Sequence, residues 1–299
     1  MTPMTRSRFT AGLALVPVLA VALATPACAG GNAERGRELF AVAAGCGCHT
    51  ATTGPVGAGG AKIETPFGTF YGTNITPDPD TGIGAWSDDE IEAAIRDGYS
   101  RGRGVEAPVM PYNWYAGMSD RDVADLIAYL RTLPPVRREN TPHEGELPLS
   151  RWAYAAWRLL FFTEPAARLV DAPASGLERG RYLADHVSLC ADCHTPRTML
   201  GAVDTSMYMA GTATGPGGKI VPNITPHETG VADWDVYDLA NVLESGMLPN
   251  FDNVQGAMAE AVDGVGGGPG YKDASDADRK AIAGYLKTVP PIVNDVEGD

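Results

Sequence analysis

The chain has 299 residues, with 23 Lys and Arg against 37 Asp and Glu, and a formal net charge of −14. Its length suffices for two modest domains. The acidic excess repels phosphate backbones and anionic lipid surfaces, which excludes nucleic acid as a partner and limits any membrane contact to a peripheral one. Its 36 glycines and 23 prolines favour many loops over long regular elements.

Residues 1–29 differ from the rest of the chain. Arg6 and Arg8 precede an apolar run, and small residues up to Ala29 supply a cleavage site, which is typical of a secretory signal peptide. The alternatives are a membrane anchor, for which the run is short, and a lipoprotein site at Cys28. We expect cleavage after Ala29 and a periplasmic protein. The segment holds two arginines and no acid, so the mature charge becomes −16.

Helices are predicted at four places, in chain order at residues 32–44, 87–97, 119–132 and 275–288. The second begins at Ser87 with Glu90 three positions on, which makes a capping box. The third and fourth begin at a serine and carry one apolar face each, formed by Val123, Leu126, Ile127 and Leu130, and by Ile282, Tyr285 and Leu286. No long alternating strand pattern occurs. The predicted class is all-α with long loops.

The sequence repeats itself. Both halves contain, in the same order, an E-R-G-R helix start, a Cys-His motif, an N-I-T-P turn, a Trp, a Met segment, an S-D helix and a Pro-Pro pair. The matching segments are 34–40 with 178–184, 74–86 with 223–234, and 118–136 with 274–292. We predict two homologous domains, residues 30–140 and 175–295, joined by a linker at 141–174.

The two Cys-His motifs contain every cysteine that follows the signal segment, namely Cys46, Cys48, Cys190 and Cys193. An exported chain can pair cysteines in disulfides, but pairs this close make strained loops, and a histidine directly follows each pair. C-x-x-C-H is the signature of covalent haem attachment, and Cys190, Cys193 and His194 match it fully. We therefore predict two covalently bound haem c groups, with His49 and His194 as iron ligands.

The first motif is one residue short. Cys48 and His49 keep the adjacency that joins one thioether to the iron ligand, but Cys46 stands one residue too close to His49. Our hypothesis is that Cys48 bonds the haem while Cys46 bonds it with strain or not at all. The second outcome leaves a free thiol.

A second iron ligand is predicted from the repeat. Met110 and Met258 each lie 24 residues after the shared tryptophan, Trp86 or Trp234. A Met/His pair is a common cytochrome c ligand set, so we assign Met110 to the first iron and Met258 to the second. The alternative role of a methionine is core filling, which we expect of the others. These are Met118, Met199, Met207, Met209 and Met247. His186 is an alternative second ligand.

Three further features have two interpretations each. Asn74, Thr76, Asn223 and Thr225 of the N-I-T-P segments either form a turn before proline or donate to haem propionates. Arg197 either pairs with a propionate or lies on the surface. Residues 147–163 are apolar but too few to cross a bilayer, and we expect a helix buried between the two domains. The alternative is a docking or interfacial patch.

The stretches "TPFGTFYGTNITPDPDTGIGAWSDDEI", "VMPYNWYAGMSDRDVADLIAYLRTLPP" and "CADCHTPR" resemble the multihaem cytochrome c subunits of periplasmic dehydrogenases for alcohols, gluconate, aldehydes or N-heterocycles. The resemblance covers nearly the whole mature chain. It implies tandem cytochrome c domains with His/Met irons that accept electrons from a catalytic partner. Two departures are the short first motif and the presence of two haem domains where many relatives have three. The resemblance carries over to Cys48, His49, Met110, Cys190, Cys193, His194 and Met258.

The expected function is electron transfer from a periplasmic dehydrogenase to the respiratory chain, and not catalysis. Two irons with both axial positions filled leave no site for substrate. The expected acceptor is a terminal oxidase, a quinone-linked complex or a soluble cytochrome. The alternative is a dihaem enzyme, a peroxidase or sulfur-compound oxidase, with one open or displaceable iron ligand. A gas sensor needs the same open position and lacks an output domain here.

Overall fold

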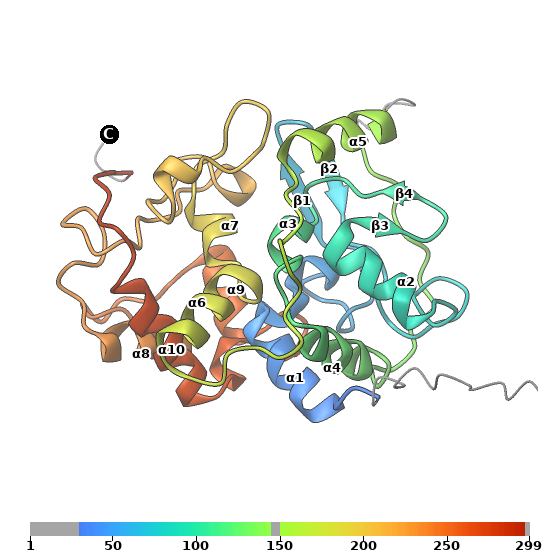
Figure 1. Cartoon of the computed structure of the whole chain (residues 1–299), viewed down its shortest axis with the longest axis horizontal. Helices are drawn as coiled ribbons and strands as arrows, with labels where there is room; N and C mark the ends of the chain where they lie inside the picture. Colours follow the sequence, from blue (N-terminus) through green and yellow to red (C-terminus); the bar gives the residue numbers. More distant parts are fainter. Residues whose placement is uncertain (1–29, 145–149, 297–299) are drawn as a thin grey trace, which may run out of the picture.

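The structure, a computed structural model, describes residues 30–144 and 150–296, so the predicted signal peptide lies outside the described residues. Figure 1 shows two helical halves side by side, the first coloured blue to green and the second yellow to red. The elements of the first half are α1 (Ala33–Val42), the 3-10 turn η1 (Ala44–His49), β1 (Lys62–Thr65), β2 (Gly68–Tyr71), α2 (Asp88–Glu92), the π-turn η2 (Ala93–Asp97), β3 (Tyr99–Ser100), β4 (Gly104–Val105), α3 (Tyr112–Tyr115) and α4 (Asp120–Leu130).

The helix α5 (Ser150–Phe161) follows the first half and precedes the second. The second half is helical throughout its regular elements. These are α6 (Gly176–His186), α7 (Cys190–His194), η3 (Thr205–Met207), η4 (Pro216–Gly218), α8 (Val236–Ser245), α9 (Gly256–Asp263), η5 (Tyr271–Asp273) and α10 (Asp276–Leu286).

Each half is built on one close helix crossing, α1 with α4 and α6 with α10. The glycine of each E-R-G-R repeat lies at this crossing. A Cβ atom at Gly36 would overlap the carbonyl oxygen of Asp125, and one at Gly180 would overlap that of Ala281. Only glycine permits two backbones to approach this closely, so the repeated motif positions the helix that leads into each Cys-His motif.

The predicted helix starts are confirmed. Ser87 and Glu90 form the expected capping box at α2, and Ser119 and Ser275 accept from the main chain at the starts of α4 and α10. The predicted apolar face of α4 is buried, as are Ile282 and Leu286 of α10, whereas Tyr285 is half-buried. Together these faces form one continuous core that runs through both halves.

The helical class is correct, but two short hairpins were not predicted. In the first, β1 pairs with β2 so that Lys62 faces Tyr71 and Thr65 faces Gly68. In the second, β3 pairs with β4. Strands of two to four residues are too short to show an alternating pattern in sequence.

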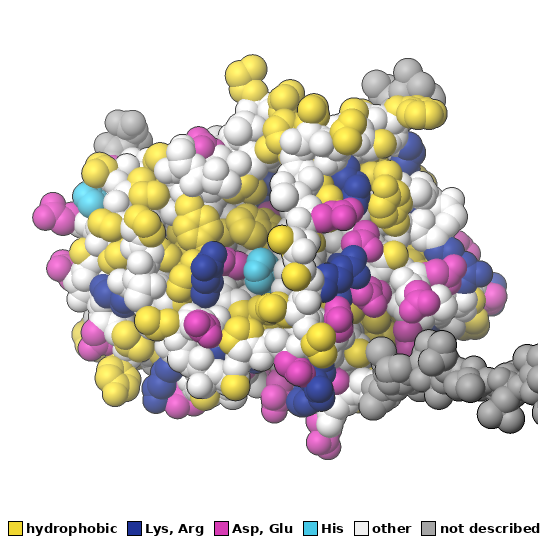
Figure 2. Space-filling model, viewed as in Figure 1, with side chains coloured by type: hydrophobic (Ala, Val, Ile, Leu, Met, Phe, Trp, Pro, Cys, Tyr) yellow, Lys and Arg dark blue, Asp and Glu magenta, His cyan; other side chains and the backbone are white. Residues whose placement is uncertain are grey.

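The prediction that the apolar linker helix is buried between the halves is wrong. No residue of α5 is buried, and Trp152, Leu159 and Leu160 are 76%, 84% and 71% exposed. The helix lies on the surface near β4, where Arg151 donates to the carbonyl oxygen of Val105. Figure 2 shows hydrophobic side chains along this edge of the molecule. In the described residues, no helix has both the length and the apolarity to cross a bilayer.

Candidate functional site

The second Cys-His motif forms the short helix α7, directly after α6. Leu189 precedes it in the left-handed conformation, with φ of 57°, and turns the chain into the motif. The imidazole of His194 donates through Nδ1 to the carbonyl oxygen of Pro222 over 2.8 Å. This bond fixes the ring orientation and leaves Nε2 as the free ligand atom.

The first motif reaches a similar result by a different backbone. Ala44, Gly45 and Cys46 are all left-handed, with φ of 52°, 63° and 46°, and η1 replaces a regular helix. The ring of His49 nevertheless donates through Nδ1 to the carbonyl oxygen of Thr73, again over 2.8 Å. Both histidines therefore present Nε2, although the segments that carry them differ.

The position of the missing residue follows from the preceding helices. Cys46 lies twelve residues after Glu34, and Cys190 lies twelve residues after Glu178. The first cysteines of the two motifs are therefore in register with their helices. The deletion falls between Cys46 and Cys48, where Gly47 stands in place of two residues.

The motif side chains are partly enclosed by protein atoms. Burial raises the pKa of Cys46 and Cys193 to about 12, with a smaller contribution from neighbouring charges, and burial raises that of Cys190 to about 11. Burial also lowers the pKa of His49 and His194. Cys48 and Cys193 nonetheless keep accessible surface, and these four cysteines form no disulfide.

These residues fit haem c. The donor set of each half offers thiols for thioether bonds, an imidazole that is neutral in its surroundings, and a thioether sulfur. A neutral ring with Nδ1 tied to a carbonyl is the form that binds iron through Nε2. The residues predicted from the sequence would hold the two groups, and this assignment stays a prediction.

The methionines fall into distinct classes. Met110, in the loop before α3, and Met258, in α9, are half-buried and pack against the core. Met118 and Met209 are fully buried, as core-filling side chains are, whereas Met199 is 96% exposed. Met207 is half-buried and Met247 is exposed. Partial burial against the core is compatible with ligation at Met110 and Met258, which stays a prediction.

The structure brings the two motifs together across the seam between the halves. Trp114 of α3 donates through Nε1 to Asp192 of α7 over 3.0 Å, and its carbonyl oxygen accepts from His186 over 2.9 Å. Cys48 is also among the neighbours that raise the pKa of Cys193, after burial and Asp192. In turn, α9 of the second half packs against η1, which carries the first motif. The segment near each predicted methionine ligand thus contacts the motif of the other half.

Two buried tyrosines beside the motifs were not predicted from the sequence. Tyr115 lies near Cys46 and Cys48, and burial raises its pKa well above the usual value, with these thiols contributing. Tyr271 stands in the same relation to Cys190 and Cys193 and donates to the carbonyl oxygen of Ser188 over 2.9 Å. Each tyrosine precedes the capping serine of the last helix by four residues, so the repeat contained the signal.

The N-I-T-P segments are turns that fasten the end of each half. Asn74 donates to the carbonyl oxygen of Val136 over 2.7 Å and accepts from the backbone and hydroxyl of Thr76. Asn223 makes the matching bonds with Ile292 and Thr225. All four Asn and Thr side chains are buried with internal partners, which favours the turn interpretation over donation to propionates.

The remaining predicted side chains are placed as follows. Trp86 and Trp234 are half-buried against the core. Arg197 is at the surface and pairs with Asp192 over 2.6 Å. His186 lies in the seam, where its Nδ1 bonds the carbonyl oxygen of Trp114, which gives it a structural role.

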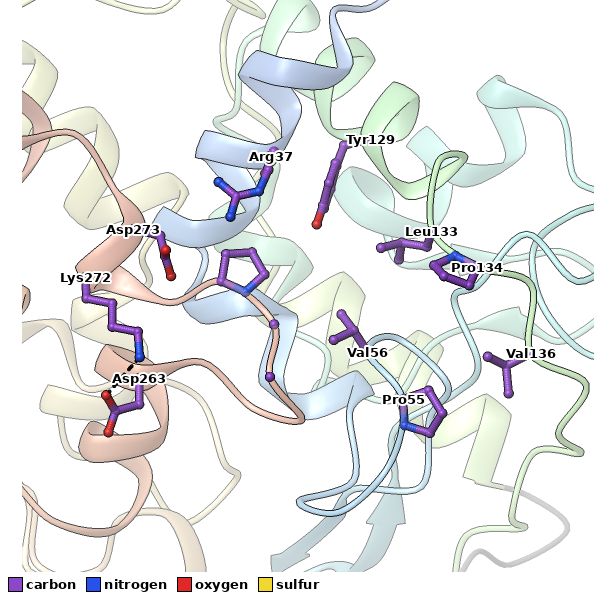
Figure 3. Close-up of a pocket in the computed structure, with 13 residues that line it drawn as sticks. Arg37, Pro55, Val56, Tyr129, Leu133, Pro134, Val136, Asp263, Lys272 and Asp273 are labelled. Atoms are coloured by element: carbon purple, nitrogen blue, oxygen red, sulfur yellow. Dashed lines mark hydrogen bonds and ion pairs between the residues drawn. The ribbon is translucent and has the colours of Figure 1, made fainter.

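A cleft of about 500 Å³ opens along the seam (Figure 3). Arg37 and Tyr129 line it from the first half, and Asp263, Lys272 and Asp273 line it from the second. Lys272 and Asp263 form an ion pair there. None of the predicted site residues lines this cleft.

Comparisons with known proteins identify the family of the chain. The sequence model of the cytochrome c family matches residues 33–134. A protein of Cereibacter sphaeroides named diheme cytochrome c-type is 39% identical over 304 residues, which cover 96% of this chain and 99% of that protein. The chain belongs to the dihaem c-type cytochromes. It carries two covalently bound haem c groups and functions in electron transfer, and the resemblance noted in the sequence is confirmed.

Cytochrome subunits of larger assemblies are also similar. The cytochrome c subunit of the quinone alcohol dehydrogenase of Gluconobacter oxydans is 33% identical over 87% of this chain and 55% of the subunit. The gluconate 2-dehydrogenase cytochrome c subunit of Pantoea cypripedii is 35% identical over 84% of this chain and 58% of the subunit. The chain thus spans a little over half the length of these two relatives.

Proposed function

We propose that this dihaem cytochrome works in the periplasm, where it accepts electrons from a dehydrogenase and passes them to the respiratory chain, and that it is not itself an enzyme. The names of the alcohol and gluconate dehydrogenase cytochrome subunits support the class of donor. The acceptor is a terminal oxidase, a quinone-linked complex or a soluble cytochrome. The signal-like N-terminal segment supports export.

The proposed sites follow the two repeats. The two tandem cytochrome c domains are residues 30–140 and 175–295, with the linker 141–174 and its helix between them. His49 and Met110 bind the first iron, and His194 and Met258 bind the second. Cys48, Cys190 and Cys193 form thioethers, and Cys46 forms one only under strain or not at all.

One observation carries this proposal most strongly, which is the matched setting of the two imidazoles. Each ring donates through Nδ1 to a carbonyl oxygen at 2.8 Å, and burial keeps each neutral. A ring held in this way needs to move little when an electron enters or leaves the site. When bound, haem c supplies a one-electron ferric/ferrous couple. The protein orients the two imidazoles and brings the two motifs close together.

The test uses the mature protein purified from the periplasm of a host that matures c-type cytochromes. We expect two low-spin haems, reversible one-electron reduction of each, and no appreciable peroxide turnover. Reduced dehydrogenase from the native host should reduce the cytochrome in stopped-flow mixing. A high-spin haem with rapid peroxide turnover would favour the dihaem enzyme instead.

A further inference from the structure

An acidic residue stands inside the second motif with no counterpart in the first. Asp192 lies between Cys190 and Cys193 in α7, whereas the first motif has only Gly47 between its two cysteines. Of the two motifs, only the second therefore has a negative charge between its cysteines. The position of Asp192 determines whether its charge affects the reduction potential of one haem or of both.

The Asp192 carboxylate is held from both halves. Trp114 of the first half donates to its Oδ1 from Nε1 over 3.0 Å. Arg197 of the second half donates to the same oxygen over 2.6 Å and also reaches the main-chain carbonyl of Asp192. The Asp192 side chain is 21% exposed, so water screens its charge only in part. The carboxylate is thus fixed at the seam and cannot swing into solvent.

This carboxylate lies close to the sites of both halves. It stands inside the second motif, between its two cysteines in α7. Its hydrogen-bond donor Trp114 lies in α3, four residues after Met110, the predicted ligand of the first iron. In agreement with this position, the charge of Asp192 contributes, after burial and two neighbouring thiols, to the raised pKa of Tyr115 beside the first motif. The contacts therefore place one carboxylate beside the predicted haem sites of both halves.

We propose that Asp192 is a shared electrostatic determinant that lowers the reduction potentials of both haems, with Trp114 and Arg197 as the residues that position it. The proposal rests on the haem sites proposed above. A nearby negative charge stabilises the ferric state, which carries one more positive charge than the ferrous state. Because Asp192 lies where the two motifs meet, the effect extends to the first haem without an acid in its own motif.

The experiment separates the charge from the hydrogen bond by redox titration of two variants. Asp192→Asn removes the charge but keeps an oxygen that accepts from Trp114, and we expect both midpoint potentials to rise. Trp114→Phe removes the hydrogen bond but keeps the charge, and we expect neither potential to rise. Arg197→Gln removes the counter-charge, so both potentials should fall. This third variant also tests the proposal if Asp192→Asn does not fold.

Intact mass and visible spectra are recorded first, to establish that each variant holds two low-spin haems. If the wild-type protein lacked them, the proposed function itself would fail. With both haems in place, unchanged potentials in Asp192→Asn and Arg197→Gln would overturn the electrostatic role. So would a shift of one potential alone, or equal shifts in Asp192→Asn and Trp114→Phe, which would indicate a purely structural clasp.

Discussion

The two Cys-His motifs perform the same task on different backbones. In the second, one left-handed residue, Leu189, leads into the regular helix α7. In the first, three consecutive left-handed residues lead into an irregular turn with one residue fewer. Both histidines still bond a carbonyl oxygen at 2.8 Å through Nδ1. The orientation of the histidine is therefore the same in both motifs, although the spacing of the thiols differs.

The surroundings explain why the short motif is accommodated in the first half. A Cβ atom at Gly45 would overlap the carbonyl oxygen of Pro269, and one at Gly47 would lie 3.1 Å from Val265 Cγ2. The glycine-rich loop of the second half, residues 264–270, therefore contacts the first motif directly. A longer, regular turn would need this space. The second motif meets the first half through the side chain of Trp114 instead.

Haem attachment should differ most between alanine variants of the two cysteines of the short motif. Cys48→Ala should remove the covalent attachment of the first haem, because Cys48 keeps the adjacency to His49. Cys46→Ala should retain two haems. Intact mass under denaturing conditions counts the attached haems. Loss of a haem from Cys46→Ala, with both retained in Cys48→Ala, would contradict the assignment.

The next effect tests whether both halves use a methionine. Met110→Leu and Met258→Leu should each abolish the methionine–iron absorption band of one haem and lower its potential, because a Met/His pair raises the potential. Met118→Leu and Met209→Leu are the matched controls, since both side chains are fully buried in the core. Their spectra should be unchanged, with a stability cost below about 1.5 kcal/mol. A retained band in both test variants would exclude these ligands.

A smaller effect, on stability, tests the equivalence of the two helix crossings. Gly36→Ala and Gly180→Ala should each lower the free energy of unfolding by about 1–3 kcal/mol or more, because the added Cβ overlaps a backbone carbonyl. Gly284→Ala in α10 is the control, since its Cβ would meet only Leu177 at 3.5 Å. That change should stabilise by up to about 1 kcal/mol. Thermal and denaturant unfolding measure all three variants. A Gly284→Ala variant destabilised as much as the other two would refute the crossing argument.

Alanine variants of the two N-I-T-P turns should change the haem potentials least of all and lower only the stability. Asn74→Ala and Asn223→Ala each remove bonds to a carbonyl oxygen and to a buried threonine, and should cost about 1–3 kcal/mol. Haem spectra and potentials should stay close to wild type, because these amides already have protein partners. A large shift in potential with little loss of stability would favour contact with the haem propionates instead.

Features with a local pattern were predictable from sequence. Ser87, Ser119 and Ser275 are read directly as helix caps, and the apolar face of α4 follows from its spacing. The Cys-His motifs carry their chemistry in adjacent residues. The internal repeat added a second instance of each feature, which is why the helical class and the two haem groups could be anticipated.

Features set by tertiary contacts were not predictable. The apolar composition of α5 predicted burial, yet Trp152 and Leu159 are exposed, because composition does not say which surface remains for a helix to cover. The hairpins are too short for a periodic signal. The bond between Trp114 and Asp192 joins residues 78 positions apart, and no pattern in either segment indicates it.

Coulometric reduction of the purified mature protein, with the visible spectrum recorded throughout, tests the central claim most directly. The account predicts an uptake of two electrons per chain, in two one-electron steps, with a low-spin spectrum for both haems. Uptake of a single electron, or a spectrum that shows one high-spin iron, would contradict the view that both halves hold working electron-transfer centres.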